Sequence, residues 1–217
     1  MIKVLIVDDH EMVRSGISKI LKTDPQITVV GEADSGEGAI AQFAACNPDI
    51  ILMDFKMAGI GGLEATRRIL QRFPKVKILV LTSEDKDVFV NRFLKLGVSG
   101  YLTKNANQAE LLEAIHTVFS GKQHFDAAIL TRIEYKGAQK NEASPFDSLS
   151  QREMQVMLMT IHGVDVKTIA RQQSLSPKTI NSYRYDIFEK LGVENDVQLT
   201  LLAVEHGLID PNEVDAS

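Results

Sequence analysis

Ile50-Ile51-Leu52-Met53-Asp54 is the stretch that decides the fold, because four apolar residues run directly into one carboxylate. A short continuous apolar run is typical of a strand that is buried on both faces, as in a parallel sheet. Asp54 follows at the carboxyl end of that strand, where α/β sheets place their ligands. The stretch therefore predicts a central parallel strand that presents Asp54 in a crevice.

Two other apolar runs end in polar residues in the same way. Residues 3–7 lead to Asp8 and Asp9, and residues 77–81 lead to Thr82. Three carboxylates gathered at one sheet edge would repel one another, and a bound cation would offset that repulsion; hard oxygen ligands with room for water suit Mg²⁺. For each single acid the alternative is that it caps the helix that follows. That alternative explains the three strand ends together less well.

Composition and charge narrow the class of protein. The chain has 217 residues, 44% of them hydrophobic, and a net charge of −5. This length allows one large domain or two small ones. The net negative charge gives the chain as a whole no electrostatic attraction to nucleic acid. Residues 166–192, however, hold five Lys or Arg against two acids, Asp186 and Glu189. No apolar run reaches membrane-spanning length and the chain starts directly with a predicted strand, so we expect a cytoplasmic protein without membrane partners.

The pattern of apolar residues changes along the chain. Residues 1–121 alternate strand and helix patterns, which predicts an α/β domain with a five-stranded, doubly wound parallel sheet. Residues 122–148 lose this periodicity and are mostly polar, so they are predicted to be a linker. Residues 149–217 change to an all-helical pattern. Within them a short helix, a tight turn and a longer basic helix after Ser176-Pro177 have the proportions of a helix-turn-helix.

Within the first 121 residues, five polar residues follow expected strands: Asp8, Asp9, Asp54, Thr82 and Lys104. Tyr101 lies three residues before the lysine. With this set, residues 1–121 resemble the receiver domain of two-component response regulators, in which a tyrosine also lies three residues before the lysine. His10, which follows the acid pair, is expected to begin the first helix.

The resemblance implies a role for each matching residue. Asp54 would accept a phosphoryl group from a sensor histidine kinase or a phosphotransfer domain. Lys104 would balance the charge on the phosphoryl oxygens, Thr82 would hydrogen-bond the group after transfer, and Tyr101 would move inward behind it as a switch. The resemblance also implies that Mg²⁺ is held by Asp8, Asp9, Asp54 and the backbone carbonyl of Lys56.

Residues 149–217 contain the motifs Leu149-Ser150-x-Arg152-Glu153, Ile169-Ala170, Leu175-Ser176-x-x-Thr179-Ile180 and Lys190-Leu191-Gly192-Val193. With these motifs they resemble the LuxR-type helix-turn-helix of the NarL/FixJ group. The stretches Ser144-Pro145-Phe146-Asp147 and Ser176-Pro177-Lys178-Thr179 resemble in particular its GacA/UvrY branch. The resemblance implies binding to double-stranded promoter DNA, as a homodimer when the chain is phosphorylated, with residues 197–206 as the DNA-bound interface. At helical spacing the candidate base readers are Lys178, Asn181, Ser182 and Tyr185. The candidate phosphate contacts are Thr179, Arg184 and Arg171.

Two readings of the acid cluster therefore remain. The leading one is a phosphorylation-controlled transcription regulator, which transfers phosphoryl to its own Asp54 and is not expected to be an enzyme with a separate substrate. The alternative is a Mg²⁺-dependent phosphohydrolase with an aspartate nucleophile, of the haloacid dehalogenase type. That type needs a second Asp two residues after the nucleophile as general acid, and Lys56 stands there.

Overall fold

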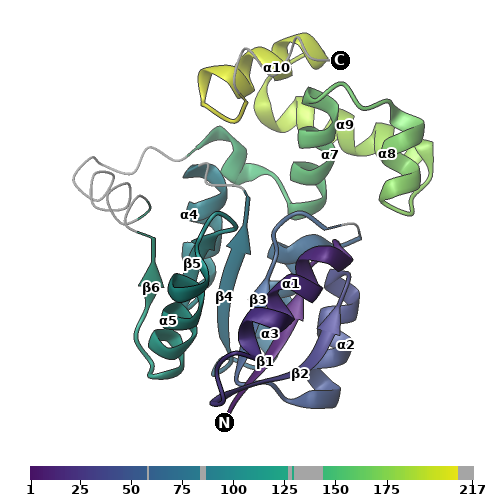
Figure 1. Cartoon of the computed structure of the whole chain (residues 1–217). Coiled ribbons are helices and arrows are strands. Elements are labelled where there is room, and N and C mark those ends of the chain that lie inside the picture. Colours follow the sequence, from purple (N-terminus) through teal and green to yellow (C-terminus); the bar gives the residue numbers. More distant parts are fainter. Residues whose placement is uncertain (58, 84–86, 127–128, 130–143, 210–217) are drawn as a thin grey trace. The chain divides into compact units, whose positions relative to one another are not determined.

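The structure is a computed structural model that describes residues 1–57, 59–83, 87–126, 129 and 144–209. The chain divides into two compact units, residues 1–140 and residues 141–217. Figure 1 shows a sheet flanked by helices in the first unit and a group of helices in the second. Every helix in the described part of the chain is too short or too polar to cross a membrane.

The first unit is built on a parallel sheet with the strand order β2-β1-β3-β4-β5-β6. Its strands are β1 (Ile2–Val7), β2 (Ile27–Ala33), β3 (Ile50–Met53), β4 (Lys77–Thr82), β5 (Gly100–Thr103) and β6 (His124–Phe125). The order reverses between β1 and β3, and doubly wound sheets bind their ligands in the crevice beside such a reversal. The predicted fold class, a doubly wound parallel sheet followed by a small helical domain, is confirmed.

The number of strands predicted from the sequence was wrong, because the sheet has a sixth strand at its edge. β6 holds only two residues, His124 and Phe125, which pair with Gly100 and Tyr101 of β5. Two half-buried residues are too few to show a periodic pattern. The strand forms because β5 offers a free edge, which is a tertiary effect that the local sequence does not encode.

The central strands are apolar because helices cover both of their faces. All four residues of β3 are buried. Val7 and Met53, the last residues of β1 and β3, lie in register with each other and with Val80 of β4. Helices α1 (Glu11–Leu21) and α5 (Gln108–Phe119) share one face, where they pack on alternate residues of the strands. The other helices of this unit are α2 (Gly36–Cys46), α3 (Gly61–Arg72) and α4 (Asp87–Leu96).

The second unit consists of helices with strong start signals. Its elements are the short 3₁₀ helix η1 (Pro145–Ser148), α7 (Gln151–Ile161), α8 (Val166–Gln172), α9 (Pro177–Leu191) and α10 (Asp196–Glu205). Ser150 and Glu153 form a reciprocal capping box at α7, and Ser176 caps α9 with Pro177 at its first position. Helix α9 ends at Gly192, whose φ of 68° is the left-handed conformation that glycine adopts without strain.

The stretch predicted as a linker, residues 122–148, contains β6 at its start and η1 at its end. Between them, residues 127, 128 and 130–143 lie outside the described residues. Phe146 of η1 is fully buried and its ring meets the ring of His206 edge to face at 5.6 Å, so η1 is part of the second unit.

Candidate functional site

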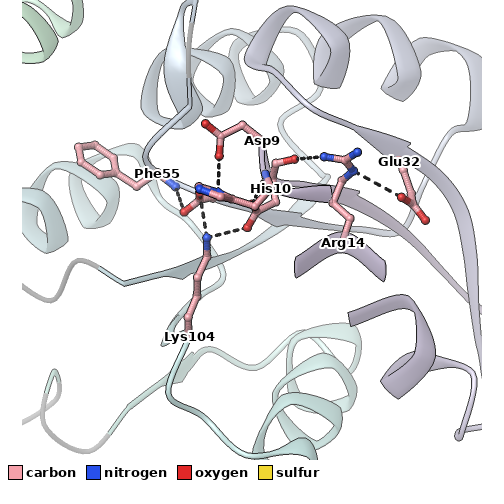
Figure 2. Close-up of polar contacts among 8 residues, drawn as sticks. Asp9, His10, Arg14, Glu32, Phe55 and Lys104 are labelled. Carbon is pink, nitrogen blue, oxygen red and sulfur yellow. Dashed lines mark hydrogen bonds and ion pairs between the residues drawn. The ribbon is translucent and has the colours of Figure 1, made fainter. Parts of the chain in front are cut away.

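Four charged side chains meet at the carboxyl end of the sheet. Asp8 and Asp9 follow β1, Asp54 follows β3, and Lys104 follows β5. The Lys104 ammonium lies 2.6 Å from Asp8 Oδ2 and 3.0 Å from Asp54 Oδ2. Figure 2 marks the contacts of Lys104 with dashed lines. The side chains at these strand ends therefore lie close together, as the sequence predicts.

Burial makes the charges of this cluster interdependent. Asp8 and Asp54 are only 2% and 3% exposed. Burial raises the pKa of Asp54 to about 6, against the opposing pull of the Lys104 ammonium and a hydrogen bond from the Phe55 N–H. Burial also disfavours the Lys104 ammonium, but its hydrogen bond to Asp8 and the charge of Asp54 outweigh that and raise the pKa of Lys104. The pair is therefore mostly ionised at neutral pH.

The three other receiver-type candidates lie on the neighbouring strands and loop. Thr82 is the last residue of β4 and is fully buried. Its backbone carbonyl accepts a hydrogen bond from the Lys104 N–H at 2.8 Å. Tyr101 is also fully buried, and its ring packs edge to face on Phe93 of α4 at 6.0 Å, so it occupies the inward position. Lys56 lies two residues after Asp54 and its side chain is exposed.

His10 does more than precede the first helix. It is the residue before α1, but no side-chain capping bond forms there. Instead its Nδ1 lies 2.7 Å from Asp9 Oδ1 and 3.3 Å from Asp8 Oδ1, and its backbone N–H donates to Asp8 Oδ1 at 2.8 Å. Sequence reasoning assigned His10 only the helix start, and it did not identify Arg14 and Glu32, which lie together on one side of Asp9 and His10 in Figure 2.

The donor set at this edge fits a divalent cation. One ligand atom from each of Asp8, Asp9, His10 and Asp54 lies within 4.8 Å of the others. Three of these residues offer carboxylate oxygens, which are the ligands that Mg²⁺ prefers. The Lys104 ammonium already lies against the Asp8 and Asp54 oxygens and partly offsets their repulsion.

The second candidate surface is one face of α9. Lys178, Asn181, Ser182 and Tyr185 are all exposed, Tyr185 to 72%. On the opposite face Ile180 and Ile187 are fully buried. The helical spacing expected from the sequence is therefore the spacing in the structure.

The three candidate phosphate contacts differ in their surroundings. Arg171 in the last turn of α8 is exposed, and Thr179 at the start of α9 is half-buried and bonded to Ser176. Arg184 is held by other groups of the same unit. Its guanidinium donates to Asp196 at the start of α10 and lies 5.7 Å from the ring centre of Phe188.

Comparisons with known families match both units. Residues 4–116 match the response regulator receiver domain. Residues 147–203 match the luxR family of bacterial regulatory proteins. The chain therefore belongs to the response regulators that join a receiver domain to a LuxR-type DNA-binding domain, and it is a regulator of transcription.

Full-length relatives show where in that family the chain lies. It is 47% identical over 211 residues to the response regulator GacA of Pseudomonas syringae pv. syringae, covering 97% of this chain and 99% of GacA. It is 46% identical over 209 residues to the response regulator UvrY of Escherichia coli K12, covering 96% of each. The predicted relation to the GacA/UvrY branch is thus confirmed.

A solved structure with similar organisation is RcsB of Salmonella enterica serovar Typhimurium, bound to the rprA promoter in the presence of the phosphomimetic BeF₃⁻. It has a TM-score of 0.64 and 28% identity, and the match covers 93% of this chain and 98% of RcsB. Another structure, described as two RcsB dimers bound to two parallel DNAs, has a TM-score of 0.60 and 28% identity over 93% of this chain and 97% of RcsB.

Proposed function

We propose that Asp54 accepts a phosphoryl group from a sensor histidine kinase or a phosphotransfer domain, and that the phosphorylated chain binds promoter DNA as a dimer. The contact of a single ammonium, that of Lys104, with both Asp54 and Asp8 is the observation that supports this most directly. It places a carboxylate nucleophile beside a fixed positive charge, and positioning with charge stabilisation is what phosphoryl transfer requires.

The chemistry follows from the protonation states. A pKa of about 6 leaves the Asp54 carboxyl mostly ionised at pH 7, so its oxygen can attack phosphorus without a separate base. The bond from phosphorus to the donor nitrogen breaks, and the donor imidazole keeps that electron pair. Lys104 then balances charge on the phosphoryl oxygens. Thr82, at the end of the adjacent strand, is the candidate to hydrogen-bond them, and Tyr101 is the candidate switch.

Mg²⁺ is the cation we propose for the acid cluster. Asp8, Asp9 and Asp54 would supply carboxylate oxygens, with the backbone carbonyl of Lys56 as a further ligand. When bound, Mg²⁺ would supply neutralisation of the charge on the transferring group. Of the acid pair, Asp9 is more exposed than Asp8, at 33% against 2% of the side chain, so it is the more accessible to an incoming ion.

DNA binding is assigned to the exposed face of α9. A basic helix of this kind enters the major groove in helix-turn-helix proteins. We assign base reading to Lys178, Asn181, Ser182 and Tyr185, and phosphate contact to Thr179, Arg171 and Arg184. The RcsB structures, described as bound to promoter DNA and as dimers on DNA, support both the DNA partner and the dimer.

Phosphorylation by a small donor tests the first part of the proposal. The chain is incubated with acetyl phosphate and Mg²⁺, and intact mass is measured. We expect one acid-stable, base-labile phosphoryl group on the wild type, none on Asp54→Asn, and none when EDTA replaces Mg²⁺. Full labelling of Asp54→Asn would overturn the assignment of the acceptor.

An electrophoretic shift tests the second part. Duplexes that the protein binds are first selected from a random pool, and their affinity is then measured with and without acetyl phosphate. We expect tighter binding after phosphorylation, and no response to acetyl phosphate in Asp54→Asn. Equal affinity in both states for the wild type would contradict control of DNA binding by phosphorylation.

A further inference from the structure

Arg14 lies behind the acid pair, and the function proposed above gives it no role. It sits in the first turn of α1, and its side chain is only 15% exposed. Its Nη1 donates to the backbone carbonyl of Asp8 at 2.7 Å, and its Nε lies 3.5 Å from Glu32 Oε2 in β2. Figure 2 shows the guanidinium between these two groups.

The contact falls where the sheet stops supporting the backbone. The N–H of Asp8 still donates to Ala33 of β2 at 3.1 Å, and the N–H of Asp54 donates to Val7 of β1 at 2.9 Å. β1 itself ends at Val7. The carbonyl of Asp8 is the next backbone group along, and it belongs to the peptide that joins Asp8 to Asp9. Arg14 therefore holds the backbone between the two carboxylates of the acid pair.

Two properties of Arg14 suit it to this position. Its hydrogen bond fixes the Asp8–Asp9 peptide, and so limits the directions that both carboxylates can take. Its side chain is also mostly buried, at 15% exposed, which limits the positions that the guanidinium can take. The Arg14–Glu32 ion pair should add little to the stability of the fold, because Glu32 is 43% exposed and exposed ion pairs contribute little. Stability alone therefore does not explain why Arg14 is held in this position.

We infer that Arg14 is a positioning residue for the cation site, with Glu32 orienting its guanidinium. Arg14 holds the Asp8 carbonyl so that the carboxylates of Asp8 and Asp9 stay directed toward Asp54. This inference rests on the proposed function, in that the acid pair must bind a divalent cation. It adds residues from α1 and β2 that touch neither the cation nor the phosphoryl group.

The test is the Mg²⁺ affinity of the full chain, measured by isothermal titration calorimetry. Arg14→Met should weaken Mg²⁺ binding about 10-fold or more, since the loss of groups that orient metal ligands typically costs about 10–100-fold in affinity. Arg14→Lys should recover part of the loss, because its ammonium can still donate to the Asp8 carbonyl. Glu32→Gln should weaken binding less than Arg14→Met.

Arg68→Met is the matched control. Arg68 is an arginine of α3 paired with a glutamate on its own helix, Glu64, at 2.6 Å, so its loss should leave Mg²⁺ affinity unchanged. Unfolding in EDTA is followed for every variant, which separates a loss of affinity from a loss of fold. If Arg14→Met does not fold, Glu32→Gln decides, because it only loosens the guanidinium.

Several outcomes overturn the inference. Wild-type Mg²⁺ affinity in folded Arg14→Met would show that Arg14 does not position Asp8 and Asp9. If Arg14→Met does not fold, wild-type affinity in Glu32→Gln would show the same. An equal loss in Arg68→Met would show a general effect of removing an arginine. If the wild-type chain bound no Mg²⁺, the proposed function would fail together with the inference. If the wild type bound Mg²⁺ and the Arg14 and Glu32 variants bound it equally tightly, only the inference would fail.

Discussion

At the scale of single residues, the shifted pKa of Asp54 links the acid cluster to the stability of the fold. Asp54 is 3% exposed, and burial raises its pKa to about 6 from an ordinary value of 3.8. The ionised carboxylate is therefore less favourable in the folded chain than in the unfolded one. Without a cation, Asp54 works against folding at neutral pH, and that is the usual relation between a reactive site and stability.

Asp54→Asn should accordingly stabilise the receiver unit in EDTA at pH 7.5. A raised pKa means that the free energy of unfolding falls as pH rises through the range from 3.8 to about 6, and stays lower above it. Each pKa unit corresponds to about 1.4 kcal/mol, so the gain should be at most about 3 kcal/mol.

Urea unfolding at pH 7.5 and at pH 5 measures this gain. The advantage of Asp54→Asn should shrink at pH 5, where part of the wild-type population is already protonated. A variant that is less stable than the wild type at pH 7.5, or equally stabilised at both pH values, would show that burial of the charge is not the dominant effect.

Base reading and phosphate contact can be tested separately, with Asn181 for the first and Arg171 for the second. Asn181 is exposed on the face of α9 assigned to base reading, and asparagine can pair with an adenine edge. Asn181→Ala should cost about 1–3 kcal/mol on the selected duplex and relax preference at one base pair. Arg171→Ala should instead weaken selected and scrambled duplexes alike, and reduce the dependence of affinity on salt.

Fluorescence anisotropy with both duplexes at two salt concentrations measures these effects. The two variants are each other's controls, because both remove one exposed polar side chain from the helix-turn-helix. An equal loss on selected and scrambled duplexes for Asn181→Ala would mean that Asn181 does not read a base.

At the scale of elements, a paired carboxylate joins α7 to α9. Both oxygens of Glu153 accept from the Lys190 ammonium, at 2.8 and 2.7 Å. Glu153 also closes the capping box of α7. Burial would raise the pKa of Glu153, but the hydrogen bonds from Lys190 and Ser150 outweigh burial and lower it.

Lys190→Met should therefore destabilise the C-terminal unit and change its response to acid. Glu153 contributes stability above its unfolded pKa of 4.5, and this is lost as pH falls through its lower folded value. Removal of the ammonium should raise that folded pKa, so acid unfolding should begin at a higher pH. Lys190 is 40% exposed, so its removal should lower the free energy of unfolding at pH 7 by only about 1–2 kcal/mol. Breaking a fully buried ion pair costs more, about 3–5 kcal/mol.

Hydrogen exchange at backbone amides of α7 and α9, measured across the acid range, reports on this unit alone. Glu153→Gln keeps the size of the side chain without its charge and should flatten the acid response. If Lys190→Met unfolds at the same pH as the wild type, the ion pair does not control acid stability.

The elements also show what the sequence could predict and what it could not. The positions of Asp8, Asp54 and Lys104 follow from a rule about parallel strands, since their carboxyl ends meet at one edge of the sheet. The capped starts of α7 and α9 follow from local motifs.

The missed features depend instead on tertiary contacts. β6 exists only because β5 offers an edge for pairing. Arg14 and Glu32 stand 18 positions apart on a helix and a strand, and no periodic pattern links them. The contact of the His10 ring with Asp9 depends on a rotamer, which the residue type alone does not fix.

At the scale of the whole molecule, charge and apolar surface are unevenly distributed. The chain is acidic overall, with a net charge of −5, while the helix-turn-helix segment from 166 to 192 is locally basic. Residues 1–140 are close to neutral, with 18 Lys or Arg against 17 Asp or Glu, and phosphorylation would add about −1.5 to −2 charge to this unit. The C-terminal unit also exposes two large apolar side chains of α10, Val197 at 68% and Leu201 at 63%.

We expect Val197 and Leu201 to form the contact between two copies of the chain on DNA. Val197 and Leu201 are four residues apart and so lie on the same side of α10. A symmetric contact through α10 would place two copies of α9 on half-sites about one helical turn apart, roughly 10 bp. Leu201→Asp should therefore abolish dimers on DNA without preventing phosphorylation of Asp54, because like charges would oppose each other across the symmetry axis.

Size-exclusion chromatography with light scattering, on the phosphorylated protein and a duplex with two half-sites, measures the stoichiometry. The wild type should bind as two copies, and affinity should fall when the half-sites are moved apart by half a helical turn. Leu201→Asp should bind one copy at a time and ignore the spacing. If phosphorylated wild type binds only as a monomer, or if Leu201→Asp still forms the two-copy complex, α10 is not the surface that joins the two chains.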